Sequence, residues 1–344
     1  MEKNRNSSFE ILRLICMLSI VLYHMLIFGL NDISENYWFY KALTILLHFG
    51  VPVFILISGW FGIKLSVKRI ITILLPLYTY TLAVYFVCIN IIGIKTDISG
   101  GVISSILLCK DSSPLWFIQP YLLLCLISPI LNSFFENSSL GNKIMIYILL
   151  AFVVFGLGFI GNYAIAQEGY TLFCFSYLYL IGRGLRKYSG CINRIHNLKQ
   201  YLFVFLFLIV IAILAFKYSG IKLLSMIAGG FFAYNSPLMY LYSIIIFYLF
   251  SFYTIESKVI NHISKGAFTI YLLASNPLIM AWTTNKALAW YCPDSPYLSI
   301  LWCCLFSLAI CVISLLLDLI IRPVLIQPIL ILINRIKVNK LIAI

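Results

Sequence analysis

Apolar residues occur along this chain in long, uninterrupted runs that are separated by short polar segments. The runs are about 17–22 residues long, which suits an α-helix that crosses the hydrocarbon core of a bilayer. They lack the alternation of apolar and polar positions that is typical of transmembrane β-strands. The pattern therefore predicts an all-α integral membrane protein with about ten transmembrane helices, over residues 10–30, 41–62, 70–92, 115–134, 144–162, 171–185, 200–216, 235–252, 266–283 and 297–321.

Two apolar segments need a separate interpretation. The first run is too long for a secretory signal and has no small-residue cleavage site after it, so we interpret it as a spanning helix. The stretch 223–234 contains Gly229 and Gly230, and we interpret it as a partly buried or re-entrant approach to the eighth span. No segment could form a soluble domain, so residues 1–344 are predicted to be a single transmembrane domain.

The composition supports this prediction. Hydrophobic residues make up 62% of the chain and charged residues 10%, with a mean hydropathy of +1.03, whereas soluble domains carry about 25% charged residues. Most cysteines lie inside apolar runs, and no cysteine–histidine cluster has the spacing of a metal site, so we expect no metal. A disulfide between Cys109 and Cys292 stays an open alternative, since the predicted loops hold both residues.

The distribution of the net charge of +13 predicts the orientation of the chain. Lysines and arginines of multi-span proteins are concentrated in cytoplasmic segments. With a cytoplasmic N-terminus and ten spans, 18 of the 24 lysines and arginines fall on the cytoplasmic side and six on the outer side. We therefore expect both termini in the cytoplasm, a contact of the basic stretch NRIKVNK with the lipid headgroups, and no binding of nucleic acid.

The first predicted helix contains Arg13 near its cytoplasmic end and His24 eleven positions later. Eleven residues of α-helix make three turns plus about 20°, so both side chains lie on one face, about 16.5 Å apart along the axis. Ionisable residues inside spans usually face a cavity or a partner. The alternatives are an anchoring role for Arg13 at the interface and a packing role for His24. Glu10, one turn before Arg13, is a candidate ion-pair partner.

Further motifs follow along the chain: FGVPVFILISGWF (49–61), KRIITILLPLY (68–78), PLWFIQPYLLLCLISPIL (114–131) and GAFTIYLLASNPLI (266–279). Together with the arginine and histidine of the first helix, they resemble the motifs of membrane acyltransferase family 3, in the order of that family. The resemblance extends over nearly the whole chain. It implies an enzyme of the bacterial cytoplasmic membrane that transfers an acyl group, commonly acetyl, from acyl-CoA to a sugar hydroxyl of a cell-surface, capsular or exopolysaccharide glycan.

The resemblance also implies roles for single residues. Arg13 and His24 would form the catalytic pair, with His24 as the base that takes the hydroxyl proton or as the carrier of a transient acyl group. Arg13, Lys68 and Arg69 would bind the phosphates of the acyl-CoA donor at the cytoplasmic mouth. For Arg69 and especially Lys68, the alternative is a role in topology alone.

Three residues are candidates for binding the glycan acceptor. Ser58 either donates a hydrogen bond to the substrate or serves as a small residue that lets two helices approach. Trp116 either stacks on a sugar or belongs to the interfacial aromatic belt. Asn276 lies in the late motif. His48 is a further candidate to line the cavity, and Asp318 and Arg322 are expected to form a structural pair four residues apart.

Two positions depart from the family pattern. Many relatives have a second arginine one turn after the first in the third-helix motif, whereas here Thr72 follows Arg69. A histidine commonly follows Tyr-Leu-Leu in the late motif, whereas here the residue is Ala274. These changes remove a cation and a possible proton carrier, so a changed substrate or an inactive relative stays an alternative. A flippase or polymerase is a further alternative, but the short, cation-poor outer loops do not favour a polymerase.

Overall fold

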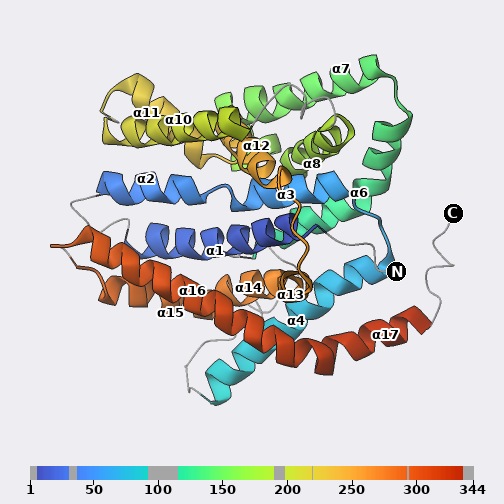
Figure 1. Ribbon diagram of the computed structural model, residues 1–344, viewed down its shortest axis with the longest axis vertical. Helices are drawn as coiled ribbons and strands as arrows, with labels where there is room; N and C mark the ends of the chain where they lie inside the picture. The colour runs from blue at the N-terminus through green and yellow to red at the C-terminus, as the bar shows by residue number, and fades with distance from the viewer. Residues whose placement is uncertain are drawn as a thin grey trace.

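The computed structural model describes residues 6–30, 37–91, 115–189, 198–218, 220–292 and 294–335. Every regular element in these ranges is helical, which confirms the all-α part of the predicted fold class (Figure 1). In chain order the helices are α1 (Ser8–Gly29), α2 (Tyr37–Leu47), α3 (Gly50–Phe61), α4 (Val67–Asn90), α6 (Ile118–Asn137), α7 (Leu140–Ala151), η1 (Phe152–Ile160), η2 (Ala164–Gly169), α8 (Leu172–Lys187), α10 (Leu198–Lys217), α11 (Lys222–Phe232), α12 (Pro237–Ser251), α13 (Lys258–Ile263), η3 (Ser264–Gly266), α14 (Ala267–Ala274), α15 (Pro277–Ala289), α16 (Pro296–Ile321), η4 (Arg322–Ile326) and α17 (Gln327–Arg335).

Seven helical stretches in the described ranges are long and apolar enough to cross a membrane, or eight if α11 and α12 form one bent span. The bend between these two helices is 52°, which agrees with the re-entrant approach expected for 223–234. Two other predicted spans are absent from this set: 171–185 corresponds to α8, which has only 16 residues, and 266–283 is divided between α14 and α15. The total of ten spans therefore stays a prediction, as does the cytoplasmic position of the termini.

The division between α14 and α15 follows from the sequence around Pro277. Proline disfavours the helical conformation in the residue before it, and Asn276 is accordingly extended, with φ −64° and ψ 131°. The Asn276 side chain accepts a hydrogen bond from the backbone N–H of Leu278 at 3.1 Å and so caps the new helix. A single predicted span thus becomes two short helices.

Helix α1 lies in the middle of the bundle and packs against α2, α3, α12, α14, α15 and α16 (Figure 1). Its residues Leu12, Cys16 and Leu26 are completely buried. Because neighbours surround this helix, its ionisable side chains Glu10, Arg13 and His24 face internal cavities of the protein.

Two glycines allow α3 and α8 to cross in close contact. A Cβ atom on Gly182 would lie 2.5 Å from the carbonyl oxygen of Leu56 and 3.0 Å from the Cα of Gly59. A Cβ atom on Gly59 would clash with the carbonyl of Tyr179. Small residues permit such close backbone approach between helices in a membrane. Gly59 therefore has a packing function, and it fixes the neighbouring Ser58 at the α3–α8 crossing.

A buried carboxylate connects the C-terminal helices to α4. Asp318 of α16 accepts hydrogen bonds from Tyr80 of α4 at 2.7 Å and from Thr269 of α14 at 2.5 Å. Arg322 pairs with the same carboxylate at 2.7 Å, which confirms the predicted pair. Arg322 also donates to the backbone carbonyl of Lys265 at 2.9 Å. Asp318 thus joins three helices and holds Arg322 in place.

We expect Asp318→Ala to destabilise the protein, because it leaves the buried hydroxyls of Tyr80 and Thr269 without their acceptor. An unsatisfied buried polar group costs about 1–3 kcal/mol. The midpoint of thermal unfolding in detergent should fall clearly, and less in Asp318→Asn, which keeps an acceptor oxygen. Asp294→Ala, at an exposed loop position, serves as the control. An unchanged midpoint in Asp318→Ala would contradict the structural function of this carboxylate.

The ten-span topology predicts that reporter fusions after Lys68, Lys199 and Lys340 all lie in the cytoplasm. The physical reason is the concentration of lysine and arginine in the segments assigned to that side. A pair of reporters that fluoresce or are enzymatically active on opposite sides of the membrane measures this directly. A fusion after Lys340 that reports the outer side would require an odd number of spans.

Candidate functional site

Two overlapping cavities of about 420 and 450 Å³ lie where α1 and α4 begin. Their linings share Phe54, Arg69, Thr72, Tyr121, Lys265, Phe268 and Arg322, so we treat them as one space and call it the vestibule. The beginnings of α1 and α4 and the helix α17 all lie toward the right of Figure 1. The vestibule therefore opens near the end of the bundle that we predict to be cytoplasmic.

The vestibule has an excess of positive charge. Among the described residues, six cations line it: Arg13, Lys64, Lys68, Arg69, Lys265 and Arg322. Glu10 is the one carboxylate in the same lining, and it already pairs with Arg13 at 2.6 Å, as predicted, and accepts a hydrogen bond from Ser264 at 2.8 Å. A concave surface with this balance of charge attracts anions.

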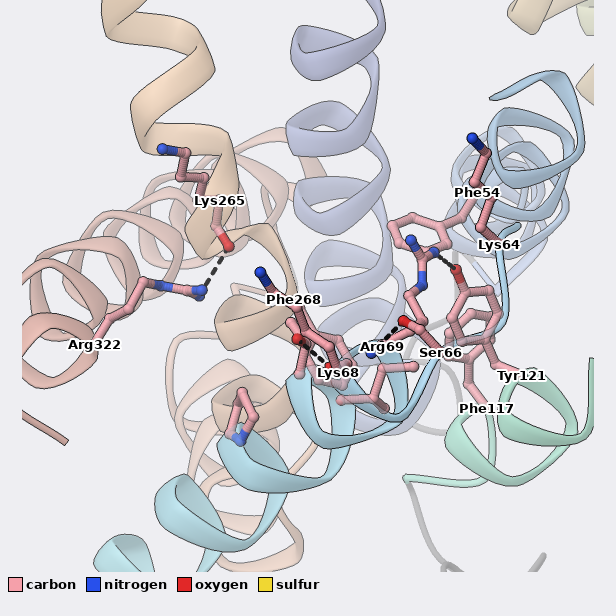
Figure 2. Close-up of a pocket in the computed structure, with 13 residues that line it drawn as sticks. Phe54, Lys64, Ser66, Lys68, Arg69, Phe117, Tyr121, Lys265, Phe268 and Arg322 are labelled. Carbon is pink, nitrogen blue, oxygen red and sulfur yellow. Dashed lines mark hydrogen bonds between the residues drawn. The ribbon is translucent and has the colours of Figure 1, made fainter. Parts of the chain in front are cut away.

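Arg69 begins a chain of hydrogen bonds that leads into the protein, and Figure 2 shows the first of them, from Arg69 to Tyr121. Its Nη2 donates to the hydroxyl of Tyr121 at 3.0 Å, and that hydroxyl lies 3.2 Å from the Oγ of Ser58. Ser58 in turn donates to the backbone carbonyl of Phe54 at 3.0 Å. The Ser58 hydroxyl is therefore already engaged within the protein, by the Phe54 carbonyl and by the Tyr121 hydroxyl.

The local sequence fixes the position of Arg69. Ser66 is the N-cap of α4, and its hydroxyl accepts the backbone N–H of Arg69 at 3.1 Å. Lys68 and Arg69 therefore lie in the first turn of the helix, beside the vestibule. The same capping that starts α4 thus places two of the predicted donor-binding residues.

His24 lies in a second, much smaller cavity, which we call the histidine chamber. Its volume is about 20 Å³, which is enough for about one water molecule. The lining consists of Ile20, Tyr23, His24, Leu47, His48, Val51, Trp116, Phe117, Tyr234 and Tyr271. The chamber is therefore bounded mainly by aromatic side chains from five separate parts of the chain.

The two histidines of this chamber each have a nitrogen available. The Nδ1 atoms of His24 and His48 are both buried, without a hydrogen-bond partner among the described residues. The His48 ring stacks on Tyr23 with a centroid distance of 4.8 Å and an interplanar angle of 1°. Buried polar atoms normally have partners, so these two nitrogens are available to a water molecule or a polar ligand in the chamber.

The structure assembles most of the residues predicted from the sequence. Arg13, Ser58, Lys68 and Arg69 line the vestibule, and His24 and Trp116 line the histidine chamber. Asn276 is completely buried and lines neither cavity; it caps α15 instead. The predicted pairing of Cys109 with Cys292 involves residue 109, which lies outside the described residues.

Four residues of these cavities were not recognised as site residues from the sequence. Lys265 and Arg322 share the vestibule with Thr72, the position where the expected second arginine is absent. Phe117 and Tyr121 belong to the Trp116 motif, one helical turn apart, and they face the cavities. Their spacing in that motif was the available signal, but it did not distinguish them from ordinary apolar positions.

The family model described as "Acyltransferase domain" of acyltransferase family 3 matches residues 6–319. Comparison with curated proteins gave no match, and comparison with solved structures gave none either. The matched region begins before Arg13 and includes every residue that lines the two cavities except Arg322. The chain therefore belongs to the membrane acyltransferase family 3 that its motifs resemble.

Proposed function

We propose that this protein transfers an acetyl group from acetyl-CoA to a sugar hydroxyl of a cell-surface glycan, at the cytoplasmic membrane of a bacterium. The observation that carries the proposal is the arrangement of α1, whose one face presents Arg13 to the cationic vestibule and His24 to the histidine chamber. An acyl-CoA has the matching form, with phosphates at one end and a thioester at the other.

The vestibule suits the phosphates of the donor. Arg13 and Arg69 offer planar guanidinium groups, which bind phosphate oxygens through two parallel hydrogen bonds. Lys68 adds a third positive charge in the first turn of α4. From Arg13, the separation of about 16.5 Å along the helix to His24 is similar in scale to an extended pantetheine arm. The thioester would thus lie at the histidine chamber.

The transfer requires one base and conserves all atoms. The sugar oxygen attacks the thioester carbonyl carbon while a ring nitrogen of His24 takes the hydroxyl proton. The carbon–sulfur bond then breaks, a carbon–oxygen ester bond remains, and the imidazolium returns its proton to the departing thiolate. The products are an acylated sugar and free coenzyme A. His48, with its own unpartnered Nδ1 in the chamber, would accept a hydrogen bond from the sugar.

We expect Arg69→Ala to weaken donor binding. The loss of charge-assisted hydrogen bonds, worth about 1.5–3 kcal/mol each, should raise the acetyl-CoA concentration for half-maximal rate about 10- to 100-fold. Arg69→Lys keeps the charge but not the planar group. Its acetyl-CoA concentration for half-maximal rate should therefore lie between those of the unchanged protein and of Arg69→Ala. The measurement is the rate of thiol release in membranes at increasing acetyl-CoA, with Lys258→Ala, at an exposed position outside both cavities, as the control.

An Arg69→Ala protein with a normal donor dependence would assign this residue to topology alone. Because Arg69 also contacts Tyr121, the variant must first be shown to insert and accumulate like the unchanged protein.

We expect His24→Ala to reduce glycan acetylation by about 10²–10⁴-fold, the usual contribution of a general base. The assay follows the transfer of radiolabel from acetyl-CoA to glycan extracted from cells in which the gene has been deleted. His262→Ala removes an exposed histidine of α13 and is the matched control. Near-normal acetylation by a correctly inserted His24→Ala protein would refute the assignment of the base. Absence of any transfer by the unchanged protein would refute the proposed function itself.

A further inference from the structure

We propose that the Phe117 ring separates the vestibule from the histidine chamber and thereby restricts the transferred acyl group to acetyl. This inference rests on the proposed function and deepens it, because it names a residue that determines which donor is used. It is carried by the position of Phe117 and by the very different volumes of the two spaces.

Phe117 is the one residue among those described that lines both the vestibule and the histidine chamber. It is the N-cap residue of α6 and is buried. On the vestibule side its ring contacts Phe54 edge-on, with the ring centroids 5.7 Å apart, and stacks on Tyr121, with the centroids 5.3 Å apart. On the chamber side it meets Tyr271 edge-on at 5.8 Å. A donor that enters from the vestibule therefore meets this ring before it reaches His24.

The space beyond the ring is small. The vestibule cavities have volumes of about 420 and 450 Å³, whereas the histidine chamber has about 20 Å³. A space that holds about one water molecule can hold a methyl group, but each further methylene must displace an aromatic ring. The neighbouring ring of Trp116 packs against Tyr170 and Tyr234, with ring centroids 4.4 and 5.9 Å apart. The chamber wall is therefore tightly packed on that side as well.

The Phe117 ring is held by packing alone, whereas the neighbouring Tyr121 is also held by hydrogen bonds with Arg69 and Ser58. The Phe117 ring has no polar atom, so its rotation breaks no hydrogen bond. Tyr121 stacks on Phe117 and contacts Arg69, so the phosphate-binding residue and the separating ring are connected through a single side chain.

The test compares acetyl-, propionyl-, butyryl- and hexanoyl-CoA as donors for the full-length protein, with the deletion-strain glycan as acceptor. The unchanged protein should use acetyl-CoA best, with a loss of about 10-fold or more per added methylene. Phe117→Ala should raise the ratio of butyryl to acetyl transfer by about 10-fold or more, because the removed ring opens the chamber to the vestibule. Phe117→Leu should give a smaller rise and preserves more of the packing if the alanine variant does not fold.

Phe155→Ala is the matched control, since it removes a partly buried phenylalanine that contacts Tyr177 and Tyr240 and lines neither cavity. Its butyryl-to-acetyl ratio should equal that of the unchanged protein. Two results would overturn the inference: equal use of butyryl and acetyl donors by the unchanged protein, or an unaltered ratio in a folded Phe117 variant. A lack of transfer from every donor would instead contradict the proposed function.

Discussion

An ionisable side chain within a membrane must have a partner or access to water, because the hydrocarbon gives it neither. Two buried carboxylates beside the vestibule meet this requirement. Glu10 pairs with Arg13 and accepts a hydrogen bond from Ser264, which lies in the C-terminal half of the chain. Asp318 accepts hydrogen bonds from Tyr80 and Thr269 and pairs with Arg322. These carboxylates neutralise part of the charge, hold two arginines in position, and tie distant helices together around a polar space.

In the proposed function, the vestibule and the histidine chamber would provide two different environments for the two parts of the donor. The vestibule is wide and cationic, so it suits a large anionic donor that arrives from water. The chamber is small and mainly aromatic, so it would keep bulk water away from a thioester placed there. The central position of α1 makes this division possible, because a single helix passes both spaces and contributes a polar residue to each.

The cation that the third-helix motif lacks at position 72 is matched by cations from other helices. Thr72 lines the vestibule together with Lys265 and Arg322, which come from the far C-terminal part of the chain. Arg322 is fixed by Asp318 and by the Lys265 carbonyl. Cations from another part of the fold thus contribute positive charge to the space in which the sequence motif lacks one, and the vestibule remains suited to a polyanion.

The sequence by itself determined the features that depend on neighbours a few residues apart. Helical periodicity placed Arg13 and His24 on one face and paired Glu10 with Arg13 and Asp318 with Arg322, because residues three, four or eleven positions apart share a helix face whatever surrounds them. The length of the apolar runs determined the all-α class in the same way. The interruption at Pro277 was also present in the sequence as a local rule, but it was missed because the apolar run continues through it.

Only the tertiary structure decided which helix faces meet. The contact of Arg69 with Tyr121 joins residues 52 positions apart, and His48 reaches the chamber of His24 from a different helix. The position of Phe117 between the two cavities also follows from the packing of whole helices. Periodicity specifies the direction of a side chain relative to its own helix axis, whereas the distance between two helices depends on the shapes of all the side chains between them. For that reason the composition of each cavity could not be obtained from the order of residues alone.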